Sequence, residues 1–489
     1  MQSQSLQAPP MLNLLKKTAV IGIAALTVCS SSSIAGDLPR PWQEAGPLTG
    51  IQLDDGTTAE AARGIWRSRG YGRLLQISER GIEQYEIGDT CYAPKRDDGS
   101  FSAMDSVGYR YFQMLPDKNS AIFQLLRGDT NVVFDRLPTM PEPCLADTVA
   151  SPSTVSEAFL DAFQRHYAFF DRRLPNHAER AARVRAAIRS DMSDAELWDT
   201  VASYMDGLSD SHTKLIGEVD GGKRRVQDGQ GETLPMVRES EGGEQAWLVG
   251  LLDQTIEKLG DTAHHVGRDR ILWGMVDKNI GYLQIFQMGG FTEREDFGSD
   301  AWAEAEMAEF NRIMDDAFSA FAQAGVDSVI LDLSNNRGGW DRIAKAIAGR
   351  FTEATYLGFT TVARGSGLAP FPHLIEPAAG PRFTDKVYLM TSDVTVSGGE
   401  LATLALRQNP RVIHVGETTR GSFSTPLAKR LPNGWLLELS NEIFSAPDGT
   451  VYEETGLTPE IAFEVYPSSA PITGHRRAIE RLVAIIMDD

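Results

Sequence analysis

The sequence predicts an α/β protein with a largely parallel sheet in its carboxyl-terminal half, a helical part before it and a small antiparallel β-rich part near the start. Three patterns support this fold class. Residues 64–137 alternate short β-type runs with turn signals. Residues 154–208 carry apolar side chains at three- and four-residue spacing, as helices do. From residue 280 onward, strand-like and helix-like runs alternate, which is typical of a parallel sheet covered by helices.

Residues 1–35 have the pattern of a secretory signal peptide. Lys16 and Lys17 precede an apolar run that is too short to span a bilayer, and small residues follow it. We expect cleavage after about Ala35 and an exported protein, periplasmic or secreted. Lipidation at Cys29 is the less favoured alternative, because the bulky Val28 stands where a lipobox has Gly or Ala.

Length and charge narrow the function classes. The 489 residues suggest about two to four domains, and 42% apolar with 23% charged residues is typical of a soluble globular protein. The formal net charge is −20. An acidic chain repels nucleic acid and anionic membranes, so we expect neither as a partner. No stretch after the leader reaches the roughly 18 apolar residues of a membrane span.

The patterns divide the mature chain into four regions. The β-rich accessory domain is expected at 40–150, with strands at 73–78, 81–87, 109–115, 121–126 and 131–134. The helical subdomain at 151–215 contains predicted helices at 154–170, 178–188 and 194–208, the last with Ser193 and Glu196 as a capping box. Residues 216–275 are interpreted as a loop or β-ribbon insertion. The α/β core at 276–489 contains predicted strands at 280–286, 329–333, 387–390 and 412–415, with a helix at 301–324 and others starting at 341 and 400.

Two cysteines remain once Cys29 leaves with the leader. Cys91 and Cys144 could pair in an oxidising compartment, and unpaired thiols are the alternative. They lack the spacing of a zinc site, so no metal is expected.

Ser397 opens a predicted helix directly after a strand, in the sequence Thr-Val-Ser-Gly-Gly-Glu. With Glu400 it fits a capping box, and that role alone could explain both residues. The same position suits a nucleophile, because the glycines admit a substrate carbonyl and the helix start offers N–H groups to an oxyanion.

A second turn with unusual glycines follows the strand at 329–333. A purely structural interpretation makes it a β-to-α turn whose glycines adopt unusual backbone angles. A functional interpretation makes the N–H of Gly338 or Gly339 an oxyanion donor beside Ser397, because the carboxyl ends of neighbouring parallel strands meet at one edge of the sheet.

A serine nucleophile needs a base. Of the eight histidines, His414 lies in an apolar strand and His475 in a polar context, whereas His212 sits in the polar sequence Leu-Ser-Asp-Ser-His-Thr at a helix end. A solvated loop histidine is the alternative for His212.

Five motifs in order resemble the tail-specific (carboxyl-terminal processing) serine peptidases; they lie at 208–213, 331–339, 395–400, 415–421 and 453–461. The resemblance covers about residues 154–465 and implies a ClpP/crotonase-like core that acts on protein or peptide substrates without metal or organic cofactor. Many relatives carry a PDZ domain, but no clear PDZ pattern stands at 216–275. No oligomeric state is predicted.

The chain departs from the Ser-Lys dyad common in that family. Ser422 occupies the lysine position, and Lys429 comes seven residues too late. The chain instead resembles the tricorn-core branch, which uses a Ser-His-Ser-Glu tetrad. That resemblance implies Ser397 as nucleophile, His212 as base, and two residues that orient it, Ser211 and Glu453, with Glu454 as the alternative to Glu453. It also implies Gly398 and Gly339 as oxyanion donors, with Gly338 as alternate.

Two rival functions stay open. A serine esterase of the α/β-hydrolase type needs a glycine where Thr395 stands and a histidine after the serine. A catalytically inactive peptide-binding scaffold with the same fold is the other.

Overall fold

The computed structural model describes residues 38–94 and 100–488. The predicted signal peptide and Cys29 lie outside the described residues. From Pro39 onward the described residues form one compact unit, and the boundaries proposed above between regions stay predictions.

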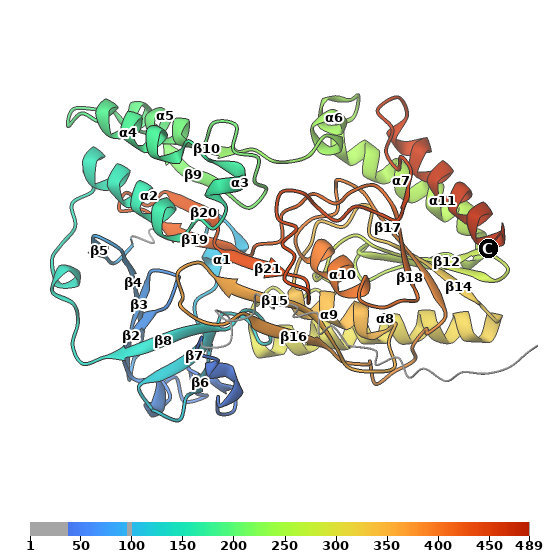
Figure 1. Cartoon of the computed structure of the whole chain (residues 1–489), viewed down its shortest axis with the longest axis horizontal. Helices are drawn as coiled ribbons and strands as arrows, with labels where there is room; N and C mark the ends of the chain where they lie inside the picture. Colours follow the sequence, from blue (N-terminus) through green and yellow to red (C-terminus); the bar gives the residue numbers. More distant parts are fainter. Residues whose placement is uncertain (1–37, 95–99, 489) are drawn as a thin grey trace, which may run out of the picture. The chain divides into compact units, whose positions relative to one another are not determined.

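The amino-terminal part is an antiparallel sheet in the order β1-β6-β7-β8-β2-β3-β4-β5 (Figure 1). The predicted strands at 73–78 and 81–87 match β3 and β4, because β-type residues there flank a short turn. The strands of this sheet are β1 (Thr49–Gly50), β2 (Gly64–Ser68), β3 (Arg73–Ser78), β4 (Gly81–Ile87), β5 (Cys91–Tyr92), β6 (Tyr111–Met114), β7 (Ser120–Gln124) and β8 (Val132–Leu137). A short helix, α1 (Ala103–Ser106), lies between β5 and β6. A disulfide joins Cys91 to Cys144, with their Cα atoms 4.7 Å apart.

The helical part follows as predicted, with shorter first and last helices. It consists of α2 (Pro152–His166), α3 (Phe170–Arg173), α4 (His177–Ala187) and α5 (Asp194–Ala202). The Ser193–Glu196 capping box at the start of α5 is confirmed. These helices share one apolar core with the amino-terminal sheet and with residues of β20 (Leu436–Ser440).

The segment at 216–275 contains more helix than expected. Strands β9 (Lys214–Val219) and β10 (Gly222–Gln227) form the predicted β-ribbon. They are followed by α6 (Thr233–Glu239) and by the long helix α7 (Gly243–Leu259), so the interpretation of this segment as loop or ribbon alone was wrong. Helix α7 starts after Gly242, which offers no side-chain cap. The usual start signal is therefore missing.

The α/β prediction is confirmed by a sheet in the order β11-β12-β13-β14-β17-β18-β22, in which β13 through β22 are parallel. Antiparallel β12 and β11 complete the β13 edge. The strands are β11 (His264–Val266), β12 (Ile271–Asp277), β13 (Ile280–Ile285), β14 (Ser328–Asp332), β17 (Lys386–Thr391), β18 (Val412–Gly416) and β22 (Ile461–Ala462).

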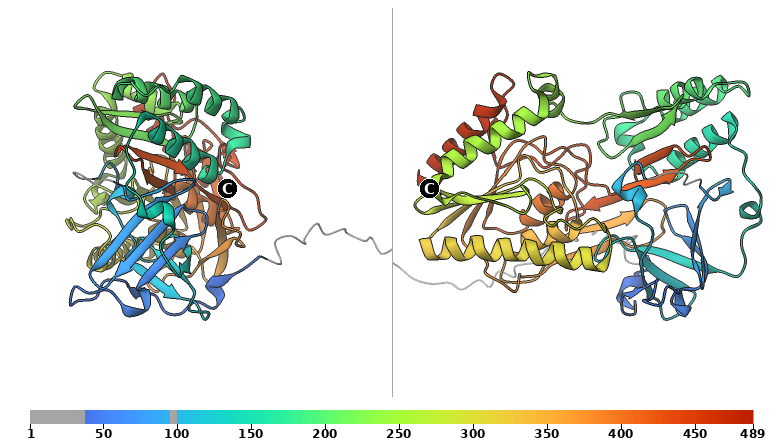
Figure 2. Two further views of the ribbon diagram at one scale, coloured as in Figure 1. Left: turned by 90° about the vertical axis from the view of Figure 1, so that its left-hand side faces the viewer. Right: turned by 180° about the vertical axis from the view of Figure 1, so that it is seen from behind.

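Helices cover both faces of this sheet (Figures 1 and 2). Alternate strand residues point to opposite faces: Leu283 packs into the core with α8 (Asp300–Ala324), α9 (Asp341–Gly349) and α10 (Gly398–Leu406), whereas Tyr282 packs into the core with α7 and α11 (Pro471–Asp488). Both faces are apolar, as expected for a parallel sheet buried between helices.

Two smaller antiparallel sheets adjoin the core. One has the order β10-β9-β20-β19 and includes β19 (Pro426–Arg430); the other has the order β16-β15-β21, with β15 (Tyr356–Ala363), β16 (Phe371–Ile375) and β21 (Glu442–Ser445). The first of these sheets joins the His212 region to the carboxyl-terminal strands.

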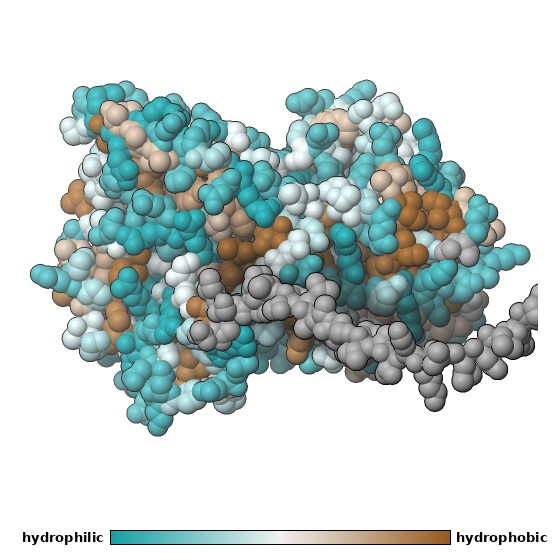
Figure 3. Space-filling model, viewed as in Figure 1, coloured by the Kyte–Doolittle hydropathy of each residue, from teal (hydrophilic) through white to brown (hydrophobic). Residues whose placement is uncertain are grey.

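Most of the face seen in Figure 3 is hydrophilic, with scattered brown apolar patches. None of the helices in the described part of the chain is both long enough and apolar enough to cross a membrane.

Candidate active site

The candidate site forms where β14 and β17 end side by side. The loop after β14 contains Gly338 and Gly339, and the loop after β17 contains Ser397. A side-chain carbon added to Gly338 would lie 2.6 Å from Ser397 Cβ, so the two loops are in close contact. This is the juxtaposition that the parallel register predicts.

Ser397 has a strained backbone. Its φ is +59° and its ψ is −124°, in a region that L-residues rarely adopt. Its side chain makes no capping hydrogen bond, so the capping-box interpretation was wrong. The partner predicted for the box, Glu400, instead accepts hydrogen bonds from Thr419 Oγ1 (2.6 Å) and from the N–H groups of Gly421 (2.6 Å) and Ser422 (2.7 Å). The hydroxyl of Ser397 is therefore not used by its own helix.

Two backbone N–H groups lie together beside Ser397. A side-chain carbon added to Gly398 would lie 3.2 Å from the Gly339 nitrogen, and neither N–H donates a hydrogen bond within the described part of the chain. The N–H of Gly338 differs, because it donates to Asn336 Oδ1 at 2.8 Å. Gly339 and Gly398 are thus available to an oxyanion, and Gly338 is already occupied.

His212 is buried, with 8% of its surface exposed, and it lines the same cavity as Ser397. Burial lowers the pKa of His212 to about 4, helped by the nearby cations Lys214 and Arg173, while Asp210 opposes the shift. The ring is therefore neutral at pH 7 and able to accept a proton. Its Nδ1 atom is enclosed and has no hydrogen-bond partner within the described residues.

Ser211 contacts the loops around His212 rather than its ring. The Ser211 hydroxyl donates to the carbonyl of Gly229. The Ser211 N–H lies 3.4 Å from Ser422 Oγ, and the carbonyl oxygen of Ser422 accepts from the Ser397 N–H at 3.0 Å. Ser422, at the family's lysine position, thus links the histidine loop to the serine loop.

Glu453 is buried and Glu454 is exposed. Glu453 accepts from the N–H of Phe423 at 2.9 Å and lies 3.2 Å from the guanidinium of Arg173. Burial raises the pKa of Glu453 to about 8, although Arg173 acts in the opposite direction. Of the two glutamates, Glu453 is the one whose carboxylate binds the backbone of Phe423, a residue of the cavity wall.

Two supporting residues were missed from the sequence. Asp210 is a buried carboxylate that accepts from the His212 N–H at 2.9 Å and from the hydroxyls of Tyr167 and Ser440, both at 3.0 Å. Asn336 holds the oxyanion loop by accepting from Gly338 and donating to the carbonyl of Ile285 at 2.8 Å. Asp210 lies in the same motif as His212, and Asn336 lies next to the glycines, so position alone could have drawn attention to both.

The alternative bases lie elsewhere. Lys429 is buried on β19, where its ammonium binds Glu86 Oε2 and the carbonyl of Gly72, both at 2.7 Å. His414 is buried in its strand, as expected. His475 is also buried, contrary to the polar setting expected for it, and it contacts Asp332 at 2.7 Å.

The cavity that contains Ser397 and His212 measures about 450 Å³. Its wall includes several apolar side chains: Leu126, Met288, Phe297, Trp302, Trp340 and Phe423. Acidic Asp129 and Asp341 also line it. Within the described ranges, no three His, Cys, Asp or Glu side chains are arranged to hold a metal ion.

The segment that contains the glycine loop and Ser397 is similar in sequence to known proteins. Residues 279–463 match the family model described as "Peptidase family S41". The carboxy-terminal processing protease CtpA of Bacillus subtilis (strain 168) is 23% identical over 223 residues, which make up 44% of this chain and 41% of that protein. The chain therefore aligns with less than half the length of this relative.

Solved structures give the same picture of the fold. A structure from Parabacteroides merdae superposes with a TM-score of 0.52 at 21% identity and covers 69% of this chain and 97% of that one. The tricorn protease superposes with a TM-score of 0.38 at 12% identity, covering 85% of this chain and 43% of its own. The first likeness shows the α/β fold, and the second is too distant to assign a branch.

The family match therefore places the similarity to peptidases in the α/β part of the chain. The match to the model of peptidase family S41 spans residues 279–463, which is less than half of the chain.

Proposed function

We propose that this chain is an active serine peptidase that hydrolyses peptide bonds through an acyl-enzyme. The observation that carries the proposal is the setting of Ser397: a strained backbone, a hydroxyl without a capping bond, and two adjacent N–H groups without partners, from Gly339 and Gly398. A helix-capping serine needs none of these features. A nucleophile needs the free hydroxyl and the two donors, and a strained backbone is common at active sites.

The chemistry follows from the positions of these groups. Ser397 Oγ attacks the substrate carbonyl while His212 removes its proton, and the carbonyl oxygen receives hydrogen bonds from Gly339 and Gly398. The Nε2 atom of His212 acts as the base, because Nδ1 is enclosed. His212 then gives the proton to the leaving amine. It next takes a proton from the water that attacks the acyl-enzyme carbonyl, and it returns that proton to Ser397 Oγ as the acid product leaves.

Ser211 and Glu453 complete the proposed tetrad as positioning residues. Ser211 holds the histidine loop against Gly229 and Ser422. Glu453 holds the Phe423 segment, which lines the cavity. Neither side chain hydrogen-bonds to the imidazole of His212, so we expect the rate to depend less on these two residues than on His212.

The substrate is a protein or peptide, and we propose export of the enzyme on the strength of the leader sequence. The Bacillus subtilis relative is named for carboxy-terminal processing. Cleavage near the carboxyl terminus of exported proteins is the corresponding proposal for this chain.

A fluorophosphonate probe tests the proposal, because it reacts covalently with activated serines. We expect labelling of the wild type and of Ser153→Ala, a control at an exposed serine, but none of Ser397→Ala. His212→Gln should label at least about 100-fold more slowly. An unlabelled wild type would favour the inactive scaffold, and hydrolysis of esters without hydrolysis of peptides would favour the esterase.

A further inference from the structure

The acidic end of the active-site cavity is built by two distant parts of the chain. Asp129 comes from the turn between β7 and β8 of the amino-terminal sheet, and Asp341 is the first residue of α9. Lys345 ties these parts together, because its ammonium donates to the carbonyl of Gly128 at 3.2 Å. The amino-terminal sheet thus contributes directly to the cavity that contains Ser397.

Asp341 has no partner of its own. Only 9% of its surface is exposed, yet its carboxylate makes no hydrogen bond or ion pair with any side chain or backbone group in the described ranges. Lys345 stands one helical turn further along α9, but no ion pair within 4.0 Å joins the two. An acid in the first turn of a helix gains about 0.3–1 kcal/mol from the helix dipole. Leaving a carboxylate buried and unpaired costs several kcal/mol, so the dipole does not explain its position.

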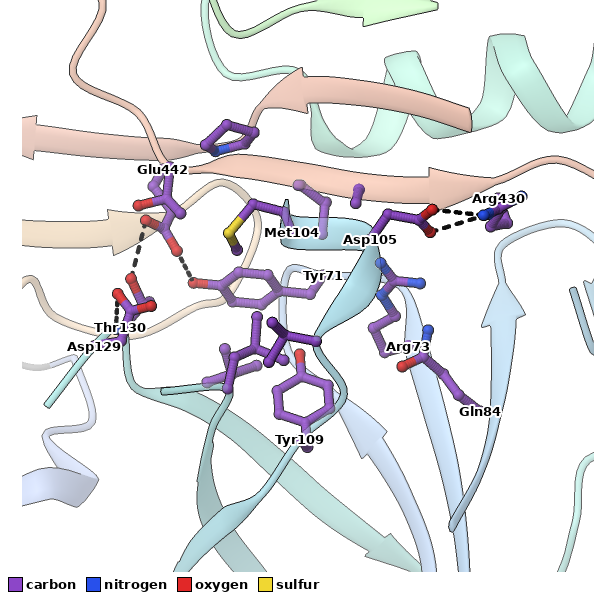
Figure 4. A pocket seen from close by; sticks show the side chains of 17 residues that line it. Tyr71, Arg73, Gln84, Met104, Asp105, Tyr109, Asp129, Thr130, Arg430 and Glu442 are labelled. Atoms are coloured by element: carbon purple, nitrogen blue, oxygen red, sulfur yellow. Dashed lines mark hydrogen bonds and ion pairs between the residues drawn. The ribbon is translucent and has the colours of Figure 1, made fainter. Parts of the chain in front are cut away.

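A third acidic side chain lies near Asp129 and Asp341. Asp129 accepts one hydrogen bond, from the Thr130 N–H at 2.8 Å, and Glu442 lies on the other side of Thr130 in the adjoining pocket (Figure 4). Both oxygens of Glu442 are occupied, by Tyr71 at 2.7 Å and Thr130 at 3.3 Å, so it adds charge without a free contact.

The pKa shifts of Asp341 and Glu442 are those expected of buried acids that no nearby cation in the described part of the chain fully neutralises. Burial raises the pKa of Asp341 well above its usual range, and Asp129 adds to the shift, whereas Lys345 opposes it. Burial also raises the pKa of Glu442, to about 7. Arg294 lines the same cavity, but Asp296 already engages it through two contacts of 2.9 and 2.7 Å.

The cavity wall also contains aromatic side chains. Trp302 and Trp340 belong to it with ring centroids 5.1 Å apart, and Phe297 packs against Trp302 at 4.8 Å. A ligand that fits this wall has an aliphatic stem and a positively charged end, because aromatic faces attract cations and the acids bind the charge.

We propose that Asp341 and Asp129 form a specificity subsite for a Lys or Arg side chain of the peptide substrate. This proposal rests on the proposed peptidase function. The aliphatic stem packs on the tryptophans, and the ammonium or guanidinium pairs with Asp341. The accessory β domain then has a role in substrate choice, since its hairpin supplies Asp129.

Binding to a catalytically silent protein tests the subsite separately from catalysis. Acetylated and amidated decapeptide pools, identical except for Lys, Arg, norleucine or citrulline at one fixed position, are equilibrated with Ser397→Ala protein, and the retained peptides are quantified by mass spectrometry. We expect Lys and Arg to be retained about 30-fold better than norleucine and citrulline, as for a desolvated charge pair.

Adding Asp341→Asn should bring the four pools to near-equal retention. Asp327→Asn, at an exposed acid before β14, should leave the preference intact, and Lys345→Gln should strengthen it. Equal retention by the Ser397→Ala protein, or a preference that survives Asp341→Asn, would overturn the subsite. A fifth pool with free amino termini and no Lys or Arg covers the remaining source of positive charge, and retention of that pool alone would overturn the side-chain assignment. Failure of fluorophosphonate labelling would instead count against the peptidase, whatever the pools show.

Discussion

The depressed pKa of His212 makes a quantitative prediction about acid activity. With a pKa of about 4, about 90% of the histidine is still neutral at pH 5. With an ordinary pKa of about 6.5, activity at pH 5 would be about 4% of that at pH 7. The two cases differ by about twentyfold in rate at pH 5, although in both cases the serine is the nucleophile and the histidine is its base.

The assay is the second-order rate of fluorophosphonate labelling of Ser397 between pH 3.5 and 8. We expect a single inflection near pH 4 in the wild type. Asp210→Asn should move it lower, because Asp210 is the group that raises the His212 pKa. His212→Gln should remove it. An inflection near 6.5, or one that persists in His212→Gln, would refute the reasoning.

The same shift affects stability, and its sign is fixed by proton binding. Between pH 6.5 and 4 the unfolded chain binds a proton at His212 that the folded chain does not. Stability from this group is therefore complete above about pH 6.5 and is lost as pH falls toward 4. The loss amounts to about 3 kcal/mol for the shift, and it should be absent in His212→Gln when urea midpoints are compared.

Three further changes should have separate effects. Gly339→Ala should lower kcat about 100-fold or more, because its new carbon would lie 2.3 Å from the Met288 carbonyl oxygen and would displace a proposed oxyanion donor. Cys91→Ser opens a disulfide with a sequence separation of 53 residues and should cost about 4 kcal/mol in urea unfolding. His475→Ala should cost about 1–3 kcal/mol, because the buried Asp332 carboxylate loses one hydrogen-bond partner and keeps Tyr282 and Ser334.

Matched controls separate these effects from general damage. Gly367→Ala replaces another glycine of positive φ, one with open space around it, and should leave kcat unchanged. Wild type under reducing conditions should match Cys91→Ser in stability. For His475, equal unfolding midpoints of the variant and wild type would show that the buried pair contributes nothing.

Local patterns predicted much of the fold. Strands β3 and β4 and the long helix α8 were predicted within one residue, because each has its own signal: β-type runs around a turn, or Ser299 before a regular apolar stripe. Helix α7 was missed. It begins at Gly243 with no side-chain cap, and its stability comes from packing on the sheet beside α11, which a local pattern does not contain.

The candidate site was likewise predicted only in part from the sequence. The sequence by itself predicted that Ser397 and the glycine loop lie at one edge of the sheet, since parallel strands bring their carboxyl ends together. His212 was predicted from the order of the motifs, and its role as base stays a proposal. Tertiary structure decided how each group is used. In the folded chain the Gly338 N–H donates to Asn336, and Glu400 binds the N–H of Ser422 instead of capping the helix at Ser397. His212 is buried, and burial lowers its pKa. Tertiary structure also brought a hairpin from the amino-terminal sheet to the active-site cavity, because long-range packing and burial depend on neighbours that no sequence window contains.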